Sequence, residues 1–465
     1  MTMTIQPSPL TLVLQSDPQL CYVLVEIGLD GKTPPGQAVN WAIVADASRS
    51  MRIPIINEAQ FRQMVRTHGA EEVLVDGMAV WQFTGPIPEE MRAQSPGALD
   101  YVVRALHSVV EQMGMADRFS LVACAEEAIV LVPTMSGAER AELIRGIEML
   151  KQLNLGEKTD LASGLQLGRS ELRKGRSTTH HPGLIERLLL LTDGFTQNPD
   201  GCLAMARLAA AEGITITTIG LGGDFQEEVL TRLADLSHGT AMFLRNADEI
   251  PQAVAQELAA ARSVVARSVA LTIRPGQQVT LYRATRISPF LGPTEPVHSH
   301  PETWAIPLGN LERGTTIRVL LEMLVSALPS PSRFTLAENQ PRTLAQLALT
   351  TNRRSPSTEP AAASDTINLV AVSTPHPLPL APAVLNAAKR ANTARLHEQA
   401  AAAASSGDNT RASRLLRTVA TRLVELGETG LAETAHREAE ALEQTGQISK
   451  FGAKELTYRT RRLGM

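Results

Sequence analysis

Three short segments of this 465-residue chain carry oxygen-bearing side chains at spacings that suit metal binding. The segments are Asp46-Ala-Ser48-Arg-Ser50, Lys158-Thr159-Asp160 and Thr192-Asp193-Gly194. They contain no His or Cys, which a softer metal would favour. Mg²⁺ binds about six oxygen ligands and readily keeps several waters among them. We therefore predict a hard-cation site formed by Asp46, Ser48, Ser50, Thr159 and Asp193, for Mg²⁺ first and with Mn²⁺ or Ca²⁺ as alternatives.

Each segment taken alone has a simpler explanation. Asp-x-Ser-x-Ser often begins a helix, because a Ser or Asp side chain accepts hydrogen bonds from the free N–H groups there. Thr-Asp before a helix is commonly a cap as well, and Asp-Gly is a frequent turn. The joint occurrence of the three segments, in order and at these spacings, favours the metal site over three separate caps and turns.

The elements expected around the segments would bring them together. A strand expected at 39–45 ends just before the first segment, and one at 187–191 ends just before the third. The second segment enters a helix expected at 161–174. Across 40–262, apolar strands alternate with amphipathic helices, which indicates a mostly parallel sheet covered on both faces. Ligands of such sheets bind beyond the carboxyl ends of the strands, where these segments lie.

Different patterns flank this α/β region. Two strand-like runs lie at 10–14 and 21–27, and after about residue 263 further short strands follow without helices between them, as in an antiparallel sandwich. An isolated pair of strands is only marginally stable, so we expect the early runs to pair with the later strands. The final Ala-, Leu-, Arg- and Glu-rich part predicts three helices, near 381–404, 408–426 and 429–445.

The predicted fold class is therefore multi-domain, α/β plus β plus α. A Rossmann-like domain would be inserted in an antiparallel β-sandwich and followed by a C-terminal helical bundle. The expected domains are 1–38 (first sandwich strands), 39–262 (α/β domain), 263–375 (remaining sandwich strands) and 376–465 (helical domain).

An insert is expected at 52–97, between the first segment and the next helix. Asp76-Gly77 separates two apolar runs there, which is a strong hairpin signal. We expect this hairpin to lie over or beside the metal face, as a lid, a partner-binding arm with Trp81 and Phe83, or a structural cover. One of its carboxylates is a candidate to occupy the metal at rest, and the candidates are Glu71, Glu72, Asp76, Glu89 and Glu90.

The ordered set Asp46-x-Ser48-x-Ser50, Thr159 and Asp193-Gly194 resembles an intact metal-ion-dependent adhesion site (MIDAS) of von Willebrand factor A (VWA) domains. The similarity extends over about 38–262 and includes the runs Thr159–Leu165 and Leu188–Gly194. It implies that Ser48, Ser50 and Thr159 coordinate the metal directly, with Asp46 and Asp193 acting directly or through water. The remaining coordination position would take an Asp or Glu of a partner. Arg49 departs from the pattern, in which a small residue is common.

The resemblance implies a metal-dependent protein-interaction module, acting as a scaffold or adaptor rather than as an enzyme. The chain is similar to bacterial cytoplasmic VWA proteins, which often work beside MoxR-type AAA+ ATPases or Ser/Thr kinases and phosphatases. Two alternatives stay open: a Mg²⁺-dependent phosphoryl-transfer or hydrolytic enzyme, and an assembly subunit whose metal only stabilises the fold. The chain shows no nucleophile with a matched His and no P-loop, which disfavours the enzyme.

The composition indicates which classes of partner and which cellular compartment to expect. A net charge of -4 and 3% aromatic residues disfavour nucleic-acid binding. There is no signal-like N-terminus and no apolar run of about 18 residues, so we expect no membrane partner and a cytoplasmic location. The three cysteines, Cys21, Cys124 and Cys202, are expected to be small apolar residues in a reducing compartment.

Three weaker features have simple interpretations. His180-His181 is expected to be exposed in a polar loop rather than to bind metal. The basic ending Arg459–Arg462 is expected to be a solvated helix face. Gly220–Gly223 ends a strand and is expected to be a tight turn, because it lacks the Lys-Ser/Thr of a phosphate-binding loop.

Overall fold

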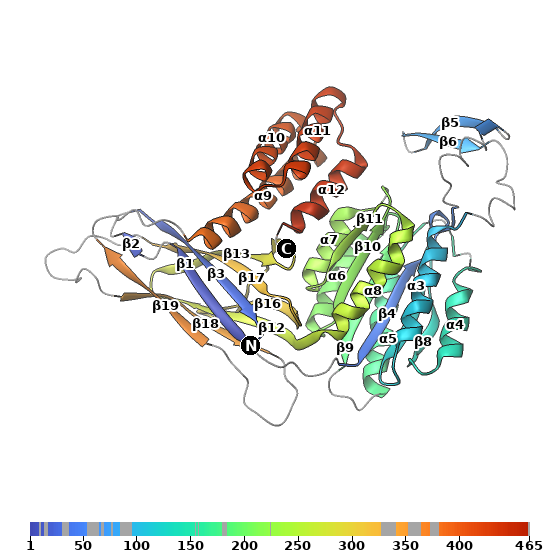
Figure 1. Ribbon diagram of the computed structural model, residues 1–465, viewed down its shortest axis with the longest axis horizontal. Helices are drawn as coiled ribbons and strands as arrows, with labels where there is room; N and C mark the ends of the chain where they lie inside the picture. The colour runs from blue at the N-terminus through green and yellow to red at the C-terminus, as the bar shows by residue number, and fades with distance from the viewer. Residues whose placement is uncertain are drawn as a thin grey trace.

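The computed structural model shows an α/β domain, two further β-sheets and a group of C-terminal helices (Figure 1). It describes the chain except residues 9–10, 14–16, 30–36, 54–64, 67–68, 76–77, 84–94, 154, 157, 179–183, 224, 327–340, 352–363, 373–380 and 464–465.

The α/β domain is built on a six-stranded sheet. From one edge to the other its strands are β11 (Ala241–Leu244), β10 (Thr215–Leu221), β9 (Ile185–Thr192), β4 (Val39–Asp46), β7 (Arg118–Cys124) and β8 (Ala128–Ser136). All neighbours are parallel except β7 and β8. Every residue of β4 and β9 is buried, as their mostly apolar sequences predict for strands covered on both faces.

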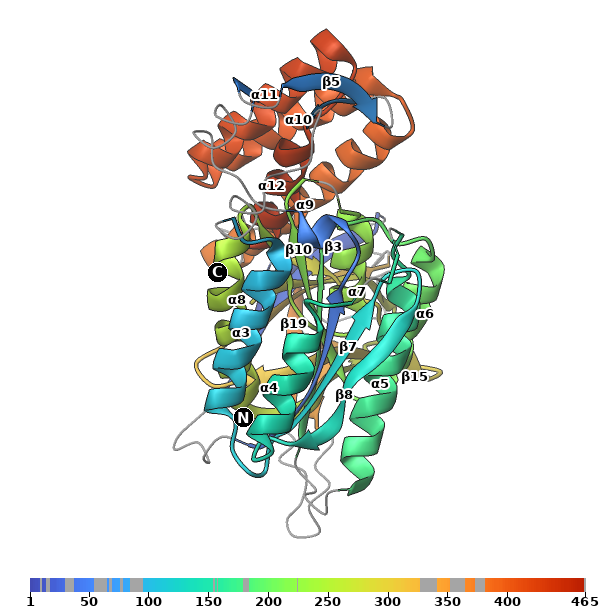
Figure 2. The same cartoon turned by 90° about the vertical axis from the view of Figure 1, so that its right-hand side faces the viewer.

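Two sets of helices cover the two faces of this sheet (Figures 1 and 2). The first set is α3 (Ala98–Gln112), α4 (Arg140–Met149) and α8 (Ile250–Arg262), which share one hydrophobic core with the sheet. The second set is α5 (Leu161–Thr178), α6 (Pro199–Ala211) and α7 (Glu227–Leu236), which share the other. Short 3₁₀ turns, η1 (Ser50–Arg52) and η2 (Ala247–Glu249), follow β4 and precede α8.

Two more sheets face each other across a common core, which contains apolar side chains from both. The first has the strand order β1 (Thr2–Ser8), β3 (Gln19–Gly28), β17 (Ile317–Val325), β13 (Val279–Ser288) and β14 (Gly292–Pro293). The second has the order β15 (Val297–His300), β16 (Thr303–Glu312), β12 (Val264–Pro275), β18 (Pro341–Thr350), β19 (Ser364–Val372) and β2 (Thr11–Val13).

The early strands pair with strands that follow the α/β domain in the sequence. β3 is antiparallel to β17, from Gln19 opposite Val325 to Ile27 opposite Ile317. β2 is parallel to β19. The chain therefore leaves these two sheets after β3 and returns to them at β12, as expected from the instability of an isolated strand pair.

The C-terminal part contains α9 (Pro382–Ser405), α10 (Asn409–Glu425), α11 (Thr429–Thr445) and α12 (Lys450–Arg461). The first three helices confirm the sequence prediction, whereas α12 was not predicted. α9 also packs on the five-stranded sheet, where Val384, Ala387 and Ala391 share a core with Leu24 and Leu320.

α12 contacts α7 of the α/β domain through side chains, at Glu227 and at Asp235. The Tyr458 side chain is buried in the core that covers the second face of the α/β sheet, beside the rings of Phe225 and Phe243. Arg461 forms an ion pair with Asp235, and both side chains are largely buried. The expectation that Arg459–Arg462 is a solvated face is therefore wrong at Arg461, because α12 packs against the α/β domain.

The inserted hairpin has the predicted position in the sequence. β5 (Ala70–Val75) and β6 (Met78–Phe83) are antiparallel, with Val75 opposite Met78, so residues 76–77 join them. They form a two-stranded sheet separate from the other three. The five candidate carboxylates of the insert, and its position relative to the metal face, lie outside what the structure describes.

Two smaller predictions have clear outcomes. The three cysteines are free and buried, as expected for small apolar residues. β10 ends at Leu221 and Gly222 has a φ of +66°, which confirms the tight turn at Gly220–Gly223. His180-His181 lies outside the described residues.

Among the described helices, none combines the length and apolar character that a bilayer crossing requires.

Candidate metal site at the carboxyl edge of the α/β sheet

The sheet register brings the first and third predicted segments together. Ala45 of β4 lies opposite Leu191 of β9, so Asp46 and Thr192 leave the sheet side by side at its carboxyl edge. The second segment is tied to the same edge, because Thr159 forms an isolated parallel bridge with Thr196. The loop that contains Asp193 is thus held between β4 and the start of α5.

Asp46 lies at the centre of the cluster and is fully buried. One carboxylate oxygen, Oδ1, accepts a hydrogen bond from the backbone N–H of Ser48 at 2.9 Å. The other, Oδ2, accepts one from the Thr192 hydroxyl at 2.6 Å. The Thr159 hydroxyl lies close enough to this carboxylate to lower its pKa. Hydrogen bonds from the first and third segments therefore fix this side chain, and a hydroxyl of the second segment lies near it.

Ser48, Ser50 and Asp193 extend the cluster toward solvent. The hydroxyl oxygens of Ser48 and Ser50 lie 3.0 Å apart, and the Ser50 hydroxyl donates to Asp193 Oδ1 at 2.7 Å. Ser48 is buried, Asp193 is half-buried and Ser50 is exposed. The turn η1 begins at Ser50 and keeps both serines on the same side of the strand end. All five predicted residues are therefore brought together in one cluster.

Gly194 lies beside two of these oxygens. A Cβ atom at this position would lie 3.9 Å from both Asp46 Oδ2 and the Thr159 hydroxyl oxygen. These two oxygens therefore face the same point of the third segment.

The electrostatics of Asp46 favour a bound cation. Burial raises the pKa of the Asp46 carboxyl, and hydrogen bonds from Thr192, Ser48 and Thr159 oppose that rise. Among the described residues, no Lys, Arg or His forms an ion pair with this carboxylate. A buried carboxylate surrounded by neutral hydroxyls is a hard, all-oxygen donor set, and a divalent cation would supply the missing positive charge. The residues present fit Mg²⁺.

This site depends on hydroxyl groups rather than on a cluster of acids. Within the described part of the chain, no group of three or more His, Cys, Asp or Glu side chains is placed to hold a metal. Only Asp46 and Asp193 contribute carboxylates here. Such a sparse donor set leaves positive charge on a bound cation and gives it affinity for an external carboxylate.

Sequence analysis did not assign a role to Thr192 or Thr196. Thr192 holds Asp46, and the buried Thr196 hydroxyl accepts a hydrogen bond from the Leu161 backbone N–H at the start of α5. A Thr at the end of a buried strand, immediately before the Asp-Gly pair, was the available signal for Thr192. Phe195 was also missed, and its side chain is 57% exposed directly beyond Gly194. Arg49 is exposed at the same edge.

The fold and this loop arrangement define the α/β part as a VWA domain. The family model of the von Willebrand factor type A domain matches residues 92–256, and that of the Sll0103-like C-terminal alpha-helical domain matches residues 382–465. The VWA match begins after Asp46–Ser50, which the insert separates from the rest of the domain. Strand β4 and its two serines are joined to that domain by the hydrogen bonds of β4 with β7 and β9.

Two curated relatives share part of this sequence. The uncharacterized protein YfbK of Escherichia coli is 25% identical over 176 residues, which cover 37% of this chain and 29% of the relative. The uncharacterized protein sll0103 of Synechocystis is 26% identical over 153 residues, which cover 32% of this chain and 34% of the relative. The matched region thus spans about a third of each relative.

Solved structures share the whole architecture. A von Willebrand factor type A protein from Catenulispora acidiphila superposes with a TM-score of 0.71 at 15% identity, covering 99% of this chain and 96% of its own. The ArnB paralog VWA2 from Sulfolobus acidocaldarius superposes with a TM-score of 0.53 at 14% identity, covering 100% and 99%. At these identities the similarity concerns the fold.

Proposed function

We propose that this protein is a metal-dependent interaction module, a scaffold or adaptor that binds an acidic side chain of a partner protein through Mg²⁺ at the MIDAS. The observation that carries the proposal is the convergence of Asp46, Ser48, Ser50, Thr159 and Asp193 at one sheet edge. These residues would hold the cation, and the cation would supply the positive charge that attracts an Asp or Glu of the partner.

The rim of the site supports binding rather than catalysis. Ser50 is exposed, so a ligand from outside can approach the cluster. Phe195 and Ile53 lie next to site residues in the sequence, and their side chains are 57% and 58% exposed. Exposed apolar side chains beside a charged centre are typical of protein-binding surfaces, where an aromatic anchor excludes water around a polar contact. We propose no enzymatic role for this edge.

The two sheets around the α/β domain have a supporting role in this proposal. We propose that they form one sandwich into which the VWA domain is inserted. The sandwich would then hold the carboxyl edge of the α/β sheet in a fixed position. We propose a cytoplasmic location. The partner classes that we propose to test first are MoxR-type AAA+ ATPases and Ser/Thr kinase or phosphatase systems.

Metal binding is tested directly by calorimetric titration of Mg²⁺ and Mn²⁺ into the full chain. We expect saturable binding that is lost in the double variant Ser48→Ala/Ser50→Ala. The matched control is Ser108→Ala, because Ser108 is an exposed hydroxyl on α3 and lies far from the cluster in the sequence. Equal binding by all three proteins would contradict the metal site.

Partner binding is tested by capture on immobilised protein with Mg²⁺ or with a chelator. We expect a partner that wild type retains only with metal, and that the double serine variant does not retain. Replacement of the contacting Asp or Glu of that partner by Asn or Gln should release it. The same partners under every condition, or phosphoester turnover that requires Asp46, would contradict the proposed function.

A further inference from the structure

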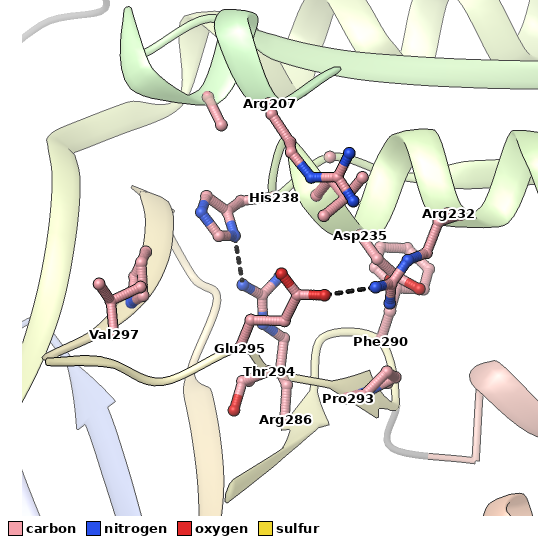
Figure 3. A pocket seen from close by; sticks show the side chains of 15 residues that line it. Arg207, Arg232, Asp235, His238, Arg286, Phe290, Pro293, Thr294, Glu295 and Val297 are labelled. Atoms are coloured by element: carbon pink, nitrogen blue, oxygen red, sulfur yellow. Dashed lines mark hydrogen bonds and ion pairs between the residues drawn. The ribbon is translucent and has the colours of Figure 1, made fainter. Parts of the chain in front are cut away.

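A second site lies where the α/β domain meets the two flanking sheets. A pocket of about 180 Å³ is lined on one side by Arg207 of α6 and by Arg232 and His238 of the α7 region. On the other side it is lined by Arg286 of β13 and Glu295. Figure 3 shows these side chains directed into a common space. Junctions between domains are common places for small-molecule sites.

The pocket lies at the edge of the α/β sheet opposite to the metal site. Asp193 follows a strand at its carboxyl end, whereas His238 precedes β11 and Arg207 lies near the end of α6, before β10. The two sites therefore share no residue. A ligand in this pocket would not require the metal site.

The carboxylates of the pocket already have arginine partners. Glu295 forms an ion pair with Arg232. Asp235 forms a two-point pair with Arg461 of α12, and one of its hydrogen bonds is 2.8 Å long. The charges within each of these two pairs neutralise each other. The two other arginines that line the pocket are Arg286 and Arg207.

Arg286 has donors that its neighbours do not satisfy. One terminal nitrogen, Nη2, lies 3.3 Å from His238 Nδ1 and donates to the Leu308 carbonyl at 3.2 Å. Its Nε atom is buried and has no hydrogen-bond partner among the described residues. Burial lowers the pKa of Arg286, but a guanidinium stays charged in proteins. A buried cation with an unused N–H group is costly unless an anion is bound beside it.

His238 is not the anion that Arg286 requires, and it adds no positive charge to the pocket near pH 7. Burial, with a smaller contribution from Arg286, lowers its pKa to about 3, so the imidazole is neutral near pH 7. Because a guanidinium only donates, His238 Nδ1 accepts from Arg286, and the ring proton lies on Nε2. The neutral ring therefore orients Arg286 without neutralising its charge, and the nearby Asp235 carboxylate is already paired with Arg461.

Arg207 supplies a second guanidinium at the mouth of the pocket. It is exposed and forms no ion pair or hydrogen bond within the described part of the chain. Arginine presents a planar set of donors that matches the oxygens of phosphate and carboxylate groups. We propose that this pocket is a binding site for a small oxyanion ligand, a phosphate- or carboxylate-bearing metabolite held between Arg286 and Arg207.

Such a ligand would join two parts of the molecule. Arg207 belongs to the α/β domain and Arg286 to the five-stranded sheet. An anion between the two arginines replaces their mutual repulsion by attraction. Binding should therefore stabilise the junction and raise the melting temperature of the whole chain.

The test is calorimetric titration of the full chain with inorganic phosphate and, separately, with succinate, at constant ionic strength. We expect saturable binding of at least one anion, and the tighter of the two identifies the ligand class. The variant Arg207→Gln should weaken that binding about tenfold or more, because it removes a charge-assisted contact from an exposed residue. Arg286→Gln should weaken it further.

The matched control is Arg145→Gln, an exposed arginine on α4 that does not line the pocket. It should bind as wild type does, which separates the pocket from general charge effects. Because Arg286 is buried, the Arg286→Gln variant is first checked for folding by thermal melting. If the Arg286 variant does not fold, the Arg207 variant alone decides the outcome. No saturable binding of either anion, or equal binding by the Arg207 and Arg145 variants, would overturn the proposal.

Discussion

Asp46 is held in place by the Ser48 backbone N–H and the Thr192 hydroxyl, and the motif predicted from the sequence gives Thr192 no role. The Thr192 hydroxyl donates to Asp46 Oδ2, so it orients the carboxylate without standing among the five predicted metal ligands. Groups that orient a ligand in this way affect metal affinity strongly even when they do not touch the metal. This gives a test of the site that leaves all five predicted ligands in place.

We expect Thr192→Val to lower Mg²⁺ affinity by about 10-fold or more, since the change keeps the shape of the side chain but removes the hydroxyl. Calorimetric titration measures the effect. Thr231→Val is the control, because the Thr231 hydroxyl only donates to carbonyls of its own helix. Unchanged affinity in the Thr192 variant would show that the hydrogen bond to Asp46 does not support metal binding.

His397 is the basis of a pH prediction at the same scale. Burial in α9 lowers its pKa to about 4, whereas the unfolded chain has the ordinary value of 6.5. Below pH 6.5 the unfolded state binds a proton that the folded state does not, so stability is lost as the pH falls from about 6.5 toward 4. Between pH 7.5 and 5.5 this costs about 1.4 kcal/mol.

We expect His397→Leu to reduce this acid-dependent loss by about that amount. The measurement is the free energy of unfolding in urea at the two pH values, for both proteins. The comparison uses the difference between pH values, so any effect of the substitution at neutral pH cancels. An equal loss in both proteins would contradict the assignment to His397.

At the scale of elements, helix α5 packs closely on the strands that position the metal site. A Cβ atom on Gly164 would lie 2.8 Å from Val44 Cγ1 and 3.0 Å from Cys124 Cβ. The absence of a side chain at this position therefore lets α5 approach β4 and β7. That approach also sets the place of Thr159, which lies just before the helix.

We expect Gly164→Ala to destabilise the protein by about 1–3 kcal/mol, because overpacking outweighs the better helix propensity of Ala. Gly430→Ala is the matched control, since a Cβ there would meet nothing within 4 Å in α11. It should be neutral or slightly stabilising. Chemical unfolding measures both, and effects of the same sign and size would contradict the close packing of α5.

The elements around the candidate site were the ones that the sequence predicted best. Strands such as β4 and β9 have mostly apolar sequences, and burial on both faces favours that pattern whatever the rest of the fold. All five predicted site residues meet because the ends of neighbouring parallel strands lie at one edge. Thr192 and Phe195 were missed because their roles depend on contacts made after folding.

The elements that were missed are stabilised by contacts from elsewhere in the chain. β1 is an edge strand with a mixed polar sequence and a Pro, and it was not predicted. α12 contains Gly452, where a Cβ would lie 1.8 Å from Glu438 Oε1 of α11, and Lys454, which is buried against Phe225. Its sequence is that of a weak helix, and its partners in α7 lie more than 220 positions away in the sequence.

At the scale of the whole molecule, α12 makes the C-terminal helices part of the α/β core. Tyr458 is only 4% exposed and belongs to the core beside β10 and β11. Lys454 and Thr457 both contact Glu227 at the start of α7, and Arg461 contacts Asp235 near its end. The two domains should therefore unfold together.

We expect Tyr458→Ala to cost about 3 kcal/mol or more and to separate the unfolding of the helices from that of the α/β domain. Calorimetric melting should then show two transitions in place of one. Phe451→Ala on the same helix is the control, because Phe451 is 48% exposed and should cost less than half as much. A single transition and equal costs would contradict the shared core.

The pairing of β3 with β17 has a consequence for the order in which the molecule can be made. Glu26 of β3 and Arg318 of β17, which form an ion pair, are separated by 292 positions. At the usual pace of a ribosome, β3 waits about 15–60 s for its partner. The last helix of the VWA domain ends at Arg262, before β17 is made, so this domain can begin to fold while β3 is still unpaired. The early strands are then exposed to aggregation and to chaperones, and the rate of translation between β3 and β17 should set the yield of native protein.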